Sequence, residues 1–287
     1  MAAASTGTAP RPQKGTPVGL ALVRDAEVLG AEPFFHEFIP GMERVLVPLG
    51  VPVLLQVVAT VQQASDRMRA WARRGQVQGL ILIDLLPGDE RVALVKQLGM
   101  PSVVIGDPVT AGGLSMVWTQ DEVAMHDVVV ELVAAGHTHL GHVGGPAQMA
   151  HTIIRRRTFD AVAAEHGVRT TTFDGDYSEA AGVRAIAALA ALDDRPTVLV
   201  FDNDVMALGA LHEAGRLDLA VPADLSLIAW DDSALCQLAV PPLSAVSHDV
   251  QELGELVGHT LAEALSSGRP RIVKAAPARL IVRGSSL

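Results

Sequence analysis

The chain has 287 residues, enough for about two domains that each bury a substantial core, and this length excludes a miniprotein held together by disulfides. Hydrophobic residues make up 49% of the chain and charged residues 19%, which is typical of a folded globular protein. The net charge of −10 argues against a chain that grips nucleic acid by itself, because such affinity rests largely on Lys and Arg neutralising phosphates.

Residues 1–15 are rich in Ala, Thr, Pro and Gly and lack the apolar core that a secretion signal needs. The longest apolar runs are interrupted and are far shorter than the roughly 20 residues that a bilayer requires. We therefore expect a cytoplasmic protein without membrane contact. Cys236 is the one cysteine, which excludes an internal disulfide and a multi-cysteine zinc site.

Short β-branched runs alternate with helical patterns along almost the whole chain, which is typical of parallel sheets covered by helices on both faces. Nearly continuous apolar runs predict buried strands over residues 18–23, 51–57, 79–83, 102–105, 140–143, 170–173, 197–201 and 225–229. Helices are predicted over residues 34–49, 64–74, 122–135, 153–166, 178–192, 204–213 and 250–266. The predicted fold class is α/β, and the restart of the pattern after residues 137–145 predicts two similar halves.

Two helix boundaries have clear local signals. Asp121 precedes an apolar-periodic stretch that stops at Gly136, which predicts an N-cap and a glycine just past the helix end. Ser178 is predicted to cap the helix that follows it in the same way.

Enzyme motifs are missing from the sequence. It has no P-loop, no nucleophile elbow and no H-E-x-x-H zinc motif. The first predicted strand is followed by Arg24, Asp25 and Ala26, where a dinucleotide fingerprint would need glycine. We therefore expect no enzyme activity and no cofactor.

Three nearby histidines suggest a metal site, because histidine is a frequent ligand of borderline metals. On a strand, however, His137 and His139 would share one face while His142 would point to the other. We favour packing at a turn or strand end, and we expect no metal.

Polar residues follow two predicted strands, at the edge where ligands bind in open α/β sheets. Asn203 and Asp204 follow residues 197–201, and Asp231 follows residues 225–229. Helix capping explains Asp204 equally well. Tyr177 lies in a loop after another strand, where it serves either as a packing plug or as a stacking platform for a flat ligand.

An ordered set of motifs resembles the effector-binding core of the lac repressor and gal repressor family of bacterial transcription regulators. The motifs occur in the order of that family over residues 17–287, and they are residues 33–35, 41–43, 79–82, 101–105, 136–137, 201–209 (FDNDVMALG), 222–226, 230–232, 241–246 and 280–283. Each motif alone is weakly specific, but their occurrence in the same order as in the family is strong support for the resemblance.

The resemblance implies a periplasmic-binding-protein-like fold of type I, with two Rossmann-like subdomains joined by three crossovers and the effector between them. We place the crossovers near residues 137, 247 and 271. The expected N-terminal subdomain is then residues 17–137 plus 248–270, and the C-terminal subdomain is residues 138–247 plus 271–287. Residues 1–16 are expected to be a disordered or linker remnant.

The resemblance also implies effector-contacting residues in the second subdomain. Arg155 matches the cleft arginine of the family, whose fork of donors suits paired hydroxyls or a carboxylate. Within residues 155–157, a run of arginines, at most two side chains can face a cleft, and solvated surface arginines are the alternative. Asn203 matches the effector-contacting amide, and Asp231 matches the carboxylate that accepts from ligand hydroxyls or amines.

Four further positions complete the expected site. Tyr177 falls where family members carry an aromatic that packs on a sugar or base, and His248 falls at a less constant contact position. Asp25 and Phe34 are expected from the first subdomain, although the loop after Asp25 is longer than the usual one.

The sequence departs from the family at Gln120, where an Asp is usual, and at Thr158, where a glycine is usual. The family's DNA-binding headpiece, about 60 residues with a helix-turn-helix, has no counterpart, because residues 1–16 cannot encode one. The chain is therefore expected to be either a fragment that begins after the hinge or a headless relative.

The expected function is that of a homodimeric sensor core of a transcription regulator, which would meet operator DNA through a separate headpiece. Its effector would be a small polar molecule such as a sugar, a sugar acid or a nucleoside. The dimer interface is expected on residues 204–213 and 234–240. The alternative is a solute-binding protein of a sugar transporter, which would need an export signal.

Overall fold

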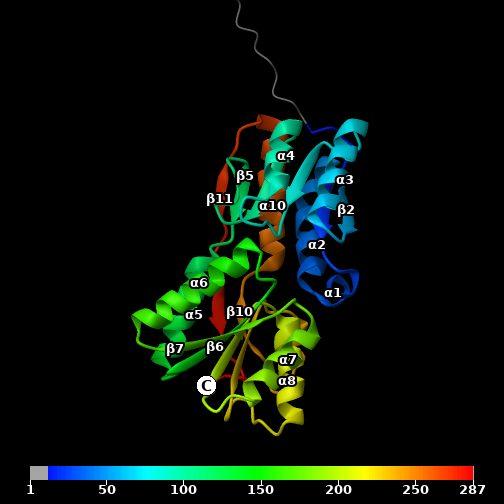
Figure 1. Ribbon diagram of the computed structural model, residues 1–287. Coiled ribbons are helices and arrows are strands. Elements are labelled where there is room, and N and C mark those ends of the chain that lie inside the picture. Colours follow the sequence, from blue (N-terminus) through cyan, green and yellow to red (C-terminus); the bar gives the residue numbers. More distant parts are fainter. Residues whose placement is uncertain (1–11, 287) are drawn as a thin grey trace, which may run out of the picture.

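The computed structural model describes residues 12–286, which form two lobes stacked end to end (Figure 1). Each lobe contains a six-stranded sheet, with order β11-β5-β4-β3-β1-β2 in the first lobe and β12-β10-β9-β8-β6-β7 in the second. All pairings are parallel except that of β12 with β10. The predicted α/β class and the two similar halves are confirmed, while most of the predicted linker, residues 1–11, lies outside the described residues.

The elements of the first lobe follow the predicted alternation of strands and helices, but the helices over residues 26–31 and 90–98 and the strand over residues 115–118 were not predicted. The elements are β1 (Val18–Val23), α1 (Ala26–Ala31), α2 (Phe34–Leu46), the 3-10 helix η1 (Val47–Leu49), β2 (Val53–Val58), α3 (Val61–Arg74), β3 (Gly79–Leu82), α4 (Glu90–Leu98), β4 (Ser102–Gly106), β5 (Ser115–Trp118), α10 (Val250–Ser267) and β11 (Ile272–Lys274).

The second lobe is built in the same way. Its elements are α5 (Asp121–Ala134), β6 (His139–Gly144), α6 (Ala150–Glu165), β7 (Arg169–Asp174), α7 (Glu179–Ala190), β8 (Val198–Phe201), α8 (Asp204–Arg216), β9 (Ser226–Trp230), α9 (Ala234–Leu238), β10 (Ser244–Ser247) and β12 (Arg279–Ile281). None of the helices among residues 12–286 is long and apolar enough to cross a membrane.

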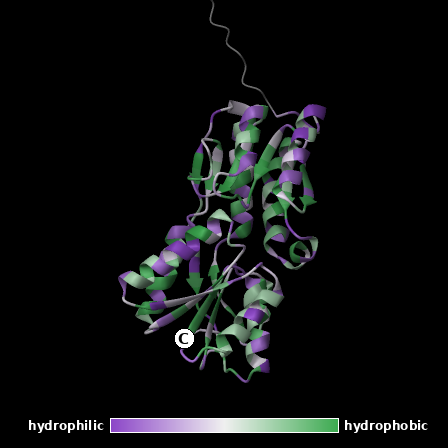
Figure 2. Ribbon diagram, in the orientation of Figure 1, coloured by the Kyte–Doolittle hydropathy of each residue, from purple (hydrophilic) through white to green (hydrophobic). Residues whose placement is uncertain are grey.

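Both faces of each sheet are covered, so the central strands are apolar on both sides. Along β1, Leu20 and Leu22 pack against α2 and α10, while Ala21 between them packs against α3. Along β8, Leu199 and Val200 divide in the same way between the two faces. Figure 2 shows the result as apolar strands enclosed by helices whose outer faces are more polar.

The chain crosses between the lobes near residues 119–120, 248–249 and 275–278. The second crossing agrees with the predicted one, but the first lies before α5 and not near residue 137. The apolar face of α5 packs on the second-lobe sheet, so this helix belongs there. The third crossing follows β11, because β11 pairs with β5 and extends the first sheet.

Of three local predictions, two were wrong and one was confirmed. Asp121 is the first residue of α5 and not its cap, because Gln120 adopts a left-handed φ of 59° and occupies that position. Ser178 does cap α7 by accepting from the backbone N–H of Ala181. The helix predicted over residues 34–49 ends at Leu46, where a 3-10 turn containing Pro48 follows.

Candidate functional site

A cleft of about 760 Å³, part of it open to solvent, lies between the lobes. Its walls come from α2, the residue after α1 and the carboxyl ends of first-lobe strands, and from α6 and the carboxyl ends of β8 and β9 in the second lobe. This is the place where open α/β sheets bind ligands.

Six of the seven predicted site residues line this cleft, namely Phe34, Arg155, Tyr177, Asn203, Asp231 and His248. Asp25 does not line it. Its carboxylate caps α1 by accepting from the backbone N–H groups of Glu27 and Val28, so the structure does not bring it to the site.

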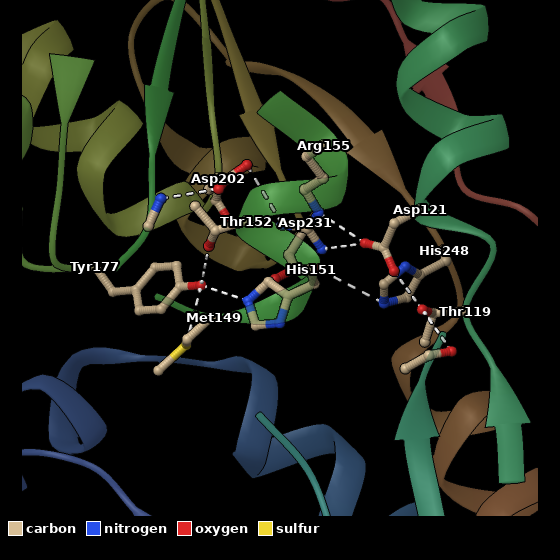
Figure 3. Close-up of polar contacts among 12 residues, drawn as sticks. Thr119, Asp121, Met149, His151, Thr152, Arg155, Tyr177, Asp202, Asp231 and His248 are labelled. Carbon is tan, nitrogen blue, oxygen red and sulfur yellow. Dashed lines mark hydrogen bonds and ion pairs between the residues drawn. The ribbon is translucent and has the colours of Figure 1, made fainter. Parts of the chain in front are cut away.

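Arg155, on α6, is held by two carboxylates and an aromatic ring. Its Nη2 lies 2.6 Å from Oδ1 of Asp121, and its Nη1 lies 3.6 Å from Oδ1 of Asp202 (Figure 3). The guanidinium also covers the ring of Trp230 at 3.8 Å. Burial opposes its charge, but Asp121 and Asp202 outweigh burial and raise the pKa of Arg155 above its ordinary value. The guanidinium therefore stays charged, and two carboxylates of the protein already balance its charge.

Both carboxylates that hold Arg155 are site residues that sequence reasoning missed. Asp121 also accepts from the Thr119 hydroxyl, and Asp202 accepts from the backbone N–H of Gly145 and interacts with His142 Nε2 at 3.0 Å. Burial alone would raise the pKa of each carboxyl. Their cationic and hydrogen-bonding partners reverse this effect and hold both pKa values below the usual range. Asp202 directly follows β8, so the strand-end rule that selected Asn203 could have found it.

The side chain of Asn203 forms two hydrogen bonds with backbone groups of the protein. Its side-chain oxygen accepts from the backbone N–H of Met206 as the N-cap of α8, and its Nδ2 donates to the carbonyl of Tyr177 at 3.0 Å. One amide hydrogen and one oxygen lone pair remain for a ligand.

Tyr177 connects the two lobes. Its hydroxyl interacts with His151 Nε2 of the same lobe at 2.6 Å. The Arg24 guanidinium of the first lobe lies over its ring, 4.9 Å from the ring centre. The backbone of Tyr177 adopts a left-handed φ of 68°. Tyr177 is 4% exposed and belongs to the hydrophobic core of the second lobe, with Arg24 over its ring, so it serves as the packing plug and not as a stacking platform. Burial raises the pKa of the phenol, which stays neutral.

Arg24, Glu32 and Asp84 form a buried cluster on the first lobe that sequence reasoning missed. Arg24 Nε lies 3.1 Å from Glu32 Oε2, and its Nη2 donates to Asp84 at 2.8 Å. Burial raises the pKa of Glu32 to about 8, because Arg24 compensates only in part. Arg24 and Asp84 directly follow the predicted strands 18–23 and 79–83, so the strand-end rule could have identified both.

Asp231 follows β9 and adopts a left-handed φ of 70°. Its carboxylate forms no side-chain hydrogen bond within residues 12–286, and His248 Nε2 lies 3.5 Å from its Oδ1. Burial raises the pKa of Asp231 to about 7, against the effect of Arg155. Burial also lowers the pKa of His248 to about 4, so this imidazole is neutral at pH 7.

The part of the chain that the structure describes contains no group of three His, Cys, Asp or Glu side chains able to hold a metal ion. The three histidines considered above have separate partners. His137 contacts Thr197, His139 contacts Thr171, and His142 contacts Asp202. The cleft as a whole offers hydrogen-bond acceptors, ring surfaces and paired charges, which are the means of binding a small polar molecule.

Comparisons with known proteins agree with this architecture. Residues 129–286 match the family described as periplasmic binding protein-like domain. The chain is 29% identical to the HTH-type transcriptional repressor CytR of Escherichia coli, over 89% of this chain and 76% of that one. It is 30% identical to an uncharacterized HTH-type transcriptional regulator in the aml 5′ region of Streptomyces limosus, over 88% and 75%. A crystal structure of a LacI family transcriptional regulator from Bifidobacterium animalis superimposes with a TM-score of 0.87 at 29% identity, covering 96% of this chain and 98% of that one.

Proposed function

The chain belongs to the lac repressor family, as a core of the periplasmic-binding-protein-like type, and we propose that its inter-lobe cleft binds a small polar effector, a sugar or a related molecule, whose presence controls transcription. The observation that carries this proposal is the convergence of polar side chains from both lobes, among them Asp231, Glu32 and Asp84, on one cleft. The relatives are transcription regulators, which favours this function over that of a transporter solute-binding protein. In this proposal the effector leaves unchanged and no reaction is catalysed.

The effector would act by changing how the two lobes sit relative to each other. Direct contacts between the lobes include the backbone hydrogen bond from Ala150 N–H to the Leu85 carbonyl at 2.9 Å, the contact of Arg24 with Tyr177, and the packing of Val28 against the second-lobe core. A ligand that touches both lobes favours one orientation by its difference in affinity for the two.

Homodimerisation and operator DNA complete the proposal. The apolar side chains of α8 are buried within the second lobe, so the predicted interface on residues 204–213 has little to offer a partner. Leu238, at the end of α9, and Val240, between α9 and β10, are instead 80% and 89% exposed, and they support a dimer contact there. DNA contact would belong to a separate basic helix-turn-helix segment acting in the cytoplasm, because a net charge of −10 does not suit a phosphate-binding surface.

A thermal-shift screen of sugars, sugar phosphates, nucleosides and nucleobases tests the proposal, since a ligand specific to the native state raises Tm. Asp231→Ala should abolish the shift. Asp127→Ala, which removes an exposed carboxylate from α5, should keep it. An undiminished shift in Asp231→Ala would place the ligand elsewhere, and a library without any hit would contradict the proposal.

A further inference from the structure

The charges that line the cleft are unbalanced. Five carboxyl groups face it, from Glu32, Asp84, Asp121, Asp202 and Asp231, against the two guanidinium groups of Arg24 and Arg155. Burial raises the pKa of Glu32 to about 8 and that of Asp231 to about 7, so in the free protein at pH 7 these two carboxyls are partly protonated. The two histidines that also line it, His151 and His248, have pKa values lowered mainly by burial and carry no charge at pH 7 to offset the excess.

Neither arginine is free to receive an anion. Arg24 lies between Glu32 and Asp84, at 3.1 and 2.8 Å, and its guanidinium also covers Tyr177. Arg155 is held by Asp121 and Asp202 in the same manner. An anionic ligand could recruit either guanidinium only by leaving buried carboxylates without their partner, which is costly.

Two carboxylates, by contrast, have unused acceptor capacity. Asp231 forms no side-chain hydrogen bond within residues 12–286. The Glu32 side chain pairs with Arg24 through Oε2 at 3.1 Å, whereas its Oε1 forms no hydrogen bond within that part of the chain. The charge of Asp231 contributes to the raised pKa of Glu32, so the two carboxyls repel each other across the cleft.

From this arrangement we propose that the effector carries a protonated amine, as an amino sugar does, and that the carboxylates of Asp231 and Glu32 recognise it. The inference rests on the proposed function and narrows its ligand class. A cation stabilises the ionised forms of the Asp231 and Glu32 carboxyls, which a neutral sugar cannot do, whereas a sugar acid or sugar phosphate would add negative charge beside Asp121 and Asp202.

Matched probes separate these ligand classes. Thermal shift and calorimetry at pH 7 would compare the amine, the neutral sugar and the uronate of the gluco, galacto and manno series. In at least one series the amine should bind about tenfold or more tightly than the neutral sugar, a difference of about 1.4 kcal/mol, and the uronate should not bind. Asp231→Asn and Glu32→Gln should each reduce the preference for the amine, while Asp127→Asn on α5 leaves it intact.

Proton release gives a second readout, because a cation should ionise carboxyls that hold protons in the free protein. The charged or titratable groups that face Asp231 lie on several elements: Arg155 on α6, Asp121 on α5, Asp202 and Asp204 at the β8–α8 junction, His248 before α10, and Glu37 on α2. Calorimetry in buffers of different ionisation enthalpy should show protons released when the amine binds, and fewer released in Glu32→Gln.

A neutral sugar or uronate that binds as tightly as its amine in the wild type, and loses binding in Asp231→Ala, would overturn the amine inference while leaving the effector function in place. Failure of every amine probe to bind, with a hit of another class from the wider screen, would do the same. Absence of any ligand in both screens would overturn the inference and the proposed function together.

Discussion

The guanidinium carbon of Arg24 lies 4.9 Å from the centre of the Tyr177 ring, so a cation of the first lobe rests on an aromatic face of the second. Glu32 and Asp84 hold the guanidinium from the first-lobe side, and His151 holds the Tyr177 hydroxyl from the other. The contact therefore links the conformation of the lobes to the charge state of the cleft.

Replacement of Arg24 should destabilise the protein. We expect Arg24→Met to lower the free energy of unfolding by about 3 kcal/mol at pH 7, because it leaves Asp84 buried without its partner. Urea denaturation measures the change. Arg44→Met is the matched control, since its ion pair with Glu255 is exposed and should contribute under about 1 kcal/mol. Equal effects of the two substitutions would show that the cluster at Arg24 is not structurally important.

The stability of the ligand-free protein should fall as the pH rises from about 5 to 8, as far as Glu32 contributes. Its pKa is raised to about 8 in the folded state, so between its unfolded value and 8 the folded protein holds a proton that the unfolded chain has lost. This contribution is complete below the unfolded pKa and disappears as the pH passes 8, with a slope of at most about 1.4 kcal/mol per pH unit.

Chemical denaturation of the wild type and Glu32→Gln across this pH range isolates that contribution. The difference between the two proteins should change with pH in the stated direction. His248, whose pKa is lowered to about 4, acts with the opposite sign below its unfolded value, so its contribution is lost as the pH falls through 6 toward 4. Parallel curves for wild type and Glu32→Gln would contradict the raised pKa.

The packing of α7 on α8 allows no side chain at Gly182. A Cβ there would lie 1.9 Å from the carbonyl oxygen of Met206. Gly182→Ala should therefore lower the free energy of unfolding by about 2 kcal/mol or more, by forcing the helices apart. Gly215→Ala, on the same α8 but with no atom within 4 Å of its Cβ, should instead stabilise by up to about 1 kcal/mol. Thermal denaturation of both variants measures these changes. A neutral Gly182→Ala would contradict the close packing of α7 on α8 at this position.

The proposed dimer should depend on the exposed apolar residues Leu238 and Val240, at and just after the end of α9. We expect Val240→Asp to convert a dimer to a monomer in sedimentation velocity at micromolar concentration, because it places a charge in an apolar contact. Val109→Asp, which alters an equally exposed valine of the first lobe, should leave the dimer intact. A wild-type protein that sediments as a monomer would contradict the dimer itself.

Local sequence patterns determined the α/β class, most strands and the main helices, because a buried parallel strand must be apolar whatever its neighbours are. The resemblance to the lac repressor family identified Arg155 and Asp231 as cleft residues. Only the tertiary structure assigned α5 to the second lobe and β11 to the first, since those choices depend on which sheet each element packs against or extends. It also revealed that Arg155 is neutralised by Asp121 and that Arg24 meets Tyr177, because a sequence gives the charges but not the partners that burial forces upon them.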